Sequence, residues 1–155
     1  MKMERLLIVC FFLVLAGCAN AEKDDLSNYI KELRKVVKAE SLAMNAYASV
    51  SGSNYTDDET VYEALTETII PASRDYLNKL EAITVRLQTK EIRALNEKAI
   101  EAVTLQNNAF VLLMDILEEQ DRSRVVDFNE RLDKARRLGR EWQTEVQDLC
   151  KKNGI

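Results

Sequence analysis

Histidine is absent from this 155-residue chain, and proline and glycine are scarce, with one and four residues. Without histidine there is no Ser-His-Asp triad, no Cys–His pair, no histidine-ligated haem and no Glu-x-x-His pair of the kind that di-metal bundles use. The sequence also lacks a glycine-rich phosphate-binding loop. We therefore expect a protein that is not an enzyme and that has no metal site and no cofactor.

Long apolar runs are also scarce, and the clearest one stands at the N-terminus. Ten apolar residues, Leu6 to Leu15, follow the cations Lys2 and Arg5. A membrane-spanning helix needs roughly 20 apolar residues, whereas a secretory signal needs about half as many. The run ends in Leu15-Ala16-Gly17-Cys18, which places small residues directly before a cysteine.

These four residues resemble the lipobox of bacterial lipoproteins, a resemblance that covers residues 1–18. It implies cleavage between Gly17 and Cys18, loss of the 1–17 signal peptide, and a diacylglycerol on Cys18 that anchors the protein to the extracytoplasmic face of the cell membrane. Ala19 follows the cysteine, as in lipoproteins forwarded to the outer membrane when the host has two membranes. The alternatives are an uncleaved membrane helix and an ordinary secretory signal.

Removal of residues 1–17 leaves 20 basic and 25 acidic side chains, and a net charge of −5. Residues 18–24 are expected to be a lipidated N-terminus and short tether, and residues 25–152 one helical domain. Cys150 is then unpaired, so the fold does not rest on an internal disulfide. Cys150 is a candidate for a disulfide-linked dimer, the alternative being a half-buried, small apolar side chain.

The rest of the chain is predicted to be helical almost throughout. Thr56 and Glu59 form a capping box before the second helix, and Thr89 is the expected N-cap of the third. Pro71 falls inside the second helix and predicts a kink there, the alternative being a break into two helices. The four predicted segments are 25–50, 56–87, 89–119 and 123–151.

Apolar residues recur at steps of three and four in all four segments. In the first, this stripe is Leu26, Ile30, Leu33, Val37, Met44 and Tyr47, and in the fourth it includes Gly139 and Trp142. Gly139 is expected to leave room for a bulky neighbour. Four stripes joined by short loops predict an all-α fold: an antiparallel up-down four-helix bundle with a kinked second helix, preceded by a cleaved signal peptide.

Two polar residues interrupt these stripes. Glu40 lies between Val37 and Met44, and Gln106 lies between Val103 and Phe110. In an antiparallel bundle both fall at similar heights, so they are expected to form a polar core layer or to line a small-ligand cavity. The alternative is that a slight rotation of the first helix turns Glu40 to solvent.

Residues 122–140 carry a local net charge of +4 in an otherwise acidic chain. Such a stripe is a candidate surface for an anionic partner. The alternative is that it pairs with Asp115, Glu118 and Glu119 on the neighbouring helix. Aromatic residues are not interleaved with the basic ones, so we expect no binding to nucleic acid. The residues proposed for the stripe are Arg131, Lys134, Arg136, Arg137 and Arg140.

The layout resembles small helical-bundle lipoproteins of Gram-positive bacteria, and that resemblance implies no activity. We expect a non-enzymatic interaction or structural module at the cell envelope, with an unidentified protein or envelope component as its partner. The alternative is a bundle that binds or senses a small ligand between its helices, near Glu40 and Gln106. A cavity with convergent polar groups favours the alternative, and a filled core favours the interaction module.

Overall fold

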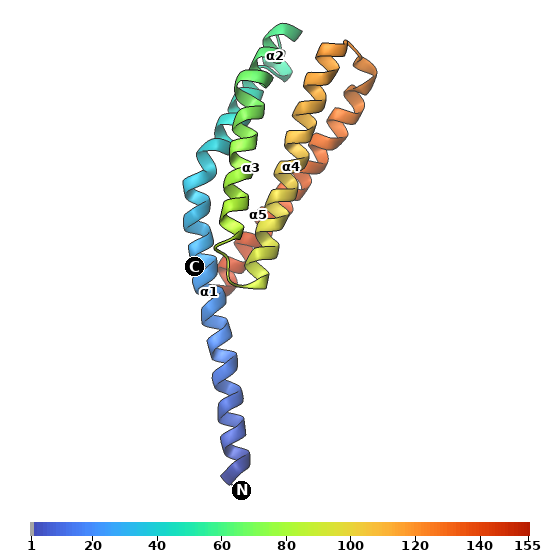
Figure 1. Cartoon of the computed structure of the whole chain (residues 1–155). Coiled ribbons are helices and arrows are strands. Elements are labelled where there is room, and N and C mark those ends of the chain that lie inside the picture. Colours follow the sequence, from blue (N-terminus) through green and yellow to red (C-terminus); the bar gives the residue numbers. More distant parts are fainter. Residues whose placement is uncertain (1) are drawn as a thin grey trace.

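The computed structural model describes the backbone of residues 2–155 and the side chains of residues 21–155. Over this range the chain is helical and contains no strand, as expected for a helical bundle (Figure 1). The predicted lipidation site Cys18 and the predicted cleavage site at Gly17 lie outside the residues whose side chains are described. The long helices are α1 (Lys2–Ser49), α3 (Ile70–Thr84), α4 (Lys90–Glu119) and α5 (Val125–Asn153).

Short elements complete the second segment and the loops. The second segment consists of α2 (Asp58–Ala64), the π-helical turn η2 (Leu65–Ile69) and α3. η2 ends at Ile69, and the amide of Ile70, the residue before Pro71, donates to the Leu65 carbonyl, which closes the wider π turn. The remaining elements are two 3-10 turns, η1 (Gly52–Asn54) and η3 (Arg122–Arg124).

The helices pack as two pairs that meet along α3 and α4. α1 lies against α3, and α4 lies against α5, whereas α1 and α5 touch at few points (Figure 1). α4 is long enough and apolar enough to cross a membrane, a property that it shares with the core helices of bundles. In this structure α4 packs between α3 and α5. The side of the bundle between α1 and α5 is therefore its least closed side.

The buried apolar side chains form two clusters rather than one continuous core. The Tyr29 cluster consists of Leu26, Tyr29, Val36, Ala39, Tyr76, Leu80, Ile83, Leu87, Ile92, Leu95, Ala99 and Val103. The Phe110 cluster consists of Val50, Val61, Leu65, Ile69, Ile70, Ala109, Phe110, Leu112, Ile116, Phe128 and Leu132. The two clusters follow one another along the axis of the bundle. Packing is incomplete at the boundary between them, where a cavity is present.

The structure corrects the predicted start of the second helix. Its N-cap is Asp57, whose carboxylate accepts a hydrogen bond from the Thr60 amide at 2.8 Å, so the capping box at Thr56 is wrong by one residue. Aspartate caps at least as well as threonine, and its charge also favours the positive end of the helix. Asp58, the next residue, forms an ion pair with Arg122.

Thr89 precedes α4 as predicted, but its hydroxyl does not cap the helix. It donates to Asp25 Oδ2 at 2.7 Å, and the amides of Gln88 and Thr89 donate to the same oxygen at 3.0 and 2.8 Å. Asp25 is buried. One carboxylate of α1 therefore holds the connection between α3 and α4.

The predicted apolar stripe of the first helix is also partly wrong. Val37 is 46% exposed, and Val36, Ala39 and Ala43 are the side chains that α1 buries in this region. The core-facing side of α1 is thus rotated from the predicted one. Glu40 follows Ala39 at the edge of the buried face, where it is half-buried.

Candidate ligand-binding cavity

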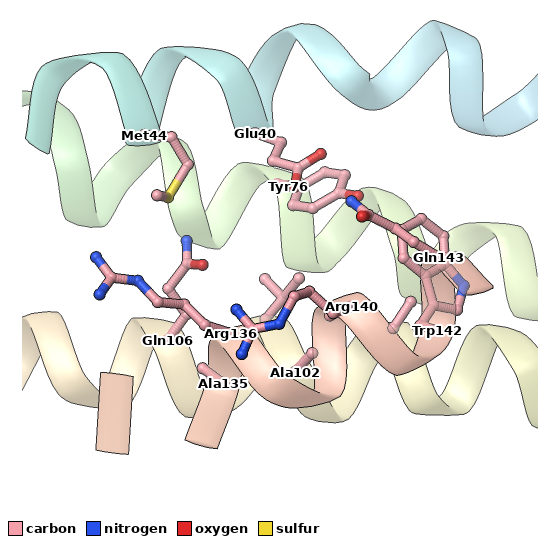
Figure 2. A pocket seen from close by; sticks show the side chains of 13 residues that line it. Glu40, Met44, Tyr76, Ala102, Gln106, Ala135, Arg136, Arg140, Trp142 and Gln143 are labelled. Atoms are coloured by element: carbon pink, nitrogen blue, oxygen red, sulfur yellow. The ribbon is translucent and has the colours of Figure 1, made fainter. Parts of the chain in front are cut away.

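A cavity of about 230 Å³ opens at the level where the Tyr29 and Phe110 clusters meet. All four long helical segments contribute to its lining: Glu40 and Met44 from α1, Tyr76 from α3, Gln106 from α4, and a set of α5 residues that includes Trp142 (Figure 2). The structure thus brings Glu40 and Gln106, the two predicted polar residues, to one cavity. Both are half-buried, and no hydrogen bond between them is found among the described residues.

Small residues create this void. The cavity lining includes Ala99 and Ala102 on α4 and Ala135 and Gly139 on α5. A Cβ atom built on Gly139 meets nothing within 4 Å, so the expectation that Gly139 makes room for a bulky neighbour is wrong. No neighbouring side chain fills the space that a side chain at position 139 would occupy, so this space is empty.

Glu40 supplies a carboxylate to the wall formed by α1 and α3. Burial raises the pKa of Glu40, and a hydrogen bond from the Tyr76 hydroxyl opposes that rise. Tyr76 is itself buried, and burial together with the neighbouring Glu40 charge raises the pKa of its hydroxyl. Figure 2 shows the Glu40 carboxylate beside the Tyr76 ring.

Arg136 and Arg140 supply the opposite charge from α5 (Figure 2). Arg136 has a long contact of 3.5 Å with Asp133 Oδ1 on its own helix, and its side chain is 45% exposed. Among the side chains described, Arg140 makes no ion pair within 4.0 Å, and neither arginine pairs with Glu40. The cavity therefore presents one negative and two positive groups that do not neutralise each other.

The predicted basic stripe spreads over several hollows along α5. Arg136 and Arg140 line the cavity, whereas Arg131, Lys134 and Arg137 border a shallow outer hollow that they share with acidic residues of the same helix. Within the described part of the chain, the predicted pairing with the neighbouring helix is found only at Glu119, which contacts Arg124 at 2.6 Å and none of the five stripe residues. Arg137 and Arg140 also line a third hollow together, so the stripe spreads around α5 instead of facing a single hollow.

Trp142 closes one end of the cavity. Its Nε1 donates to the Tyr29 hydroxyl at 3.1 Å, and its ring is half-buried against the Tyr29 cluster. Tyr29 is fully buried, and burial raises the pKa of its hydroxyl. Tyr29 is not among the residues predicted from the sequence, although its spacing of three residues from Leu26 was a usable signal. The hydrogen bond between Trp142 and Tyr29 joins α1 to α5 across the least closed side of the bundle.

A second hollow, of about 350 Å³, lies where the end of α1 meets α2, the end of α4 and the start of α5. Its walls are mostly apolar and its polar rim includes Tyr55, Asp58 and Arg122. The Tyr55 hydroxyl donates to Asp58 at 2.8 Å, and Arg122 pairs with the same carboxylate. The rim charges of this hollow already neutralise each other, so the first cavity is the better candidate site.

The remaining candidate residues lie away from the cavity. Cys150 is half-buried and, with Val146 and Leu149, packs against the Tyr29 cluster. Within residues 21–155 no three acidic or cysteine side chains gather in a way that could hold a metal ion.

No protein-family model, curated protein or solved structure matches this chain.

Proposed function

We propose that this protein is a lipoprotein, anchored through Cys18 to the extracytoplasmic face of a membrane, whose helical bundle binds a small polar ligand without reacting with it. The observation that carries the proposal is the cavity in which Glu40 and Gln106 meet Arg136 and Arg140. These residues come from three different helices and converge on one void. A partly enclosed void with a few convergent polar groups is the usual form of a small-ligand site.

An interaction or structural module, the first expectation from the sequence, does not explain this level of the bundle. A void forfeits dispersion contacts, and glycine inside a helix costs about 1 kcal/mol relative to alanine. Gly139 incurs both penalties, because an added Cβ would contact nothing. A ligand that fills the void and pairs with the charges accounts for both features.

The proposal includes an antiparallel up-down order of the helices and a bend at Pro71. Contacts between helix ends support the order: Asp25 binds the loop before α4, and Tyr62 near the start of the second segment donates to Glu118 near the end of α4. The π turn that is closed by the residue before Pro71 supports the bend, because such turns distort the helix that contains them.

The proposed anchor also sets the height of the cavity. Glu22, four residues after Cys18, accepts hydrogen bonds from Lys152 at 3.3 Å and from Asn153 at 3.4 Å, so the bundle begins almost at the lipid attachment site. Glu40 stands about 27 Å further along α1, at a rise of about 1.5 Å per residue. The cavity is then beyond the bilayer surface and would take its ligand from the aqueous compartment, at the cell membrane or at the outer membrane of a two-membrane host.

Substitutions at Gly139 test the binding function. Gly139→Leu places a side chain in the cavity, and Gly139→Ala is its matched control because it brings a similar gain in helix propensity with only one methyl group. The full chain, purified in detergent, is equilibrated with the small-molecule fraction of its host and analysed by native mass spectrometry. We expect the parent and Gly139→Ala to retain a ligand, and Gly139→Leu to retain at least tenfold less while unfolding at no lower temperature.

Two results would overturn the proposal. If Gly139→Leu retains as much ligand as Gly139→Ala, the ligand binds elsewhere. If the parent retains no small molecule at any concentration tested, the cavity has no ligand and the interaction module becomes the better hypothesis. Replacement of both Glu40 and Gln106 by leucine gives an independent check, since a stable double variant that still binds the ligand would remove these residues from the site.

A further inference from the structure

We infer that the cavity accepts a small zwitterion, an amino acid or a short peptide with free ends, whose ammonium group lies at Glu40 and whose carboxylate lies at Arg136 and Arg140. This inference rests on the proposed binding function and names the chemical class of its ligand. It follows from the opposite charges of the two walls, from their lack of mutual pairing and from the size of the void.

The wall formed by α1 and α3 suits a cation. Glu40 makes no ion pair with any described residue, and it shares this part of the cavity with the aromatic ring of Tyr76. Burial disfavours the ionised form of Glu40 and raises its pKa. A ligand ammonium group would supply an ionic partner beside the Tyr76 hydroxyl and would gain attraction from the faces of nearby aromatic rings.

The α5 wall suits a carboxylate. Arg136 and Arg140 are four residues apart on one helix, so their side chains project from the same face. The guanidinium group matches a carboxylate through paired N–H donors, and such bonds are stronger than those between neutral groups. The one ion pair found for either arginine is the long contact of Arg136 with Asp133, which leaves most of these donors available.

Ligands with a single charge fit less well. An anion would place like charge near Glu40, which is already poorly solvated, and a cation would face two guanidinium groups. The volume of about 230 Å³ also lies below the range of about 300–1,000 Å³ that is usual for pockets of drug-sized ligands. A small molecule that carries both charges satisfies both walls at once.

Oligoglycines test this inference because they vary the distance between the two charges without adding side chains. Glycine, diglycine and triglycine are titrated into the full chain in detergent by isothermal calorimetry. We expect one length to bind most tightly, and its N-acetyl and C-amide derivatives to bind at least tenfold more weakly. The preferred length then reports the separation between the two charged walls.

Charge-removing variants assign each end of the probe. Glu40→Gln should abolish the preference for a free ammonium group and keep the preference for a free carboxylate, and Arg140→Gln should do the reverse. Arg131→Gln is the matched control, because it removes an arginine from the same helix at a position on the outer hollow. This control should bind the probe as the parent does.

Three outcomes would overturn the inference. In the first, the N-acetyl and C-amide derivatives bind as tightly as the free oligoglycine. In the second, Glu40→Gln and Arg140→Gln bind the probes as Arg131→Gln does. In the third, no oligoglycine binds at millimolar concentration. If Gly139→Leu still loses the host-derived ligand in that case, the binding function stands and only the ligand class is wrong. If no oligoglycine binds and Gly139→Leu also retains as much host-derived ligand as Gly139→Ala, the proposed binding function is wrong as well.

Discussion

Replacement of Asp25 by alanine should destabilise the bundle, because the Asp25 carboxylate holds the connection between α3 and α4. Its Oδ2 accepts three hydrogen bonds, from the amides of Gln88 and Thr89 and from the Thr89 hydroxyl, at 3.0, 2.8 and 2.7 Å. A hydrogen bond to a charged group contributes about 1.5–3 kcal/mol. Gln88 is exposed and Thr89 is half-buried, so water replaces part of this loss. We therefore expect Asp25→Ala to cost about 2–4 kcal/mol rather than the full sum.

Two further variants divide this cost. Asp25→Asn retains an acceptor but loses the charge and should cost about half as much. Thr89→Val removes only the hydroxyl donor and should cost about 1 kcal/mol. Because the Asp25 and Thr89 side chains contact each other, their double variant should be less destabilised than the sum of the two single variants, by about 1 kcal/mol.

Urea unfolding followed by circular dichroism measures these differences. Asp24→Ala is the matched control, because Asp24 is exposed and adjacent, and no hydrogen bond to its side chain is found among the described residues. It should change the free energy of unfolding by less than about 0.5 kcal/mol. An equally small effect of Asp25→Ala, or full additivity in the double variant, would mean that Asp25 does not hold the α3–α4 connection.

Three further predictions concern the cap, the cavity end and the anchor. Hydrogen bonds from Thr60 lower the pKa of Asp57. The ionised Asp57 therefore stabilises the fold above the unfolded pKa of about 3.9, and this stabilisation is lost as pH falls through the lower folded pKa. The difference in free energy of unfolding between the parent and Asp57→Ala should be clear at pH 7 and should shrink under strong acid. Trp142→Phe leaves the Tyr29 hydroxyl without its donor and should cost about 1 kcal/mol in urea unfolding, less in a Tyr29→Phe background. Cys18→Ala should abolish incorporation of labelled palmitate and release the protein from membranes, and equal labelling of this variant would contradict the lipoprotein assignment.

The helices were predictable because breakers and caps act locally. The predicted 89–119 segment and the observed Lys90–Glu119 helix differ by one residue, and the predicted 123–151 segment covers most of Val125–Asn153. The face of α1 was less predictable. Val36 and Val37 are equally apolar neighbours, and only packing against α3 decides which of them is buried.

The candidate site was partly visible in the sequence. Glu40 and Gln106 drew attention because each interrupts an apolar stripe, and both line the cavity. The common face of Arg136 and Arg140 was also readable, because the two residues are spaced by four positions on one helix. What the sequence could not show was the void itself, because a glycine indicates a small residue and does not say whether a neighbour fills the space.

The strongest reason to regard this level of the bundle as a site is that several stabilising rules fail there together. A helical glycine with open space beside it, a half-buried carboxylate without an ion pair and two arginines without close ionic partners each occur singly in ordinary helices. Other single departures occur in the described residues, because the buried Ser73, Asn96 and Asn107 each have a side-chain oxygen without a hydrogen-bond partner, but none of these three residues lines the cavity. Local departures that coincide at one place are expected where function, rather than stability, selects the residues. A ligand that fills the void and pairs with both charged walls removes all of these departures at once, whereas a surface partner would leave them in place.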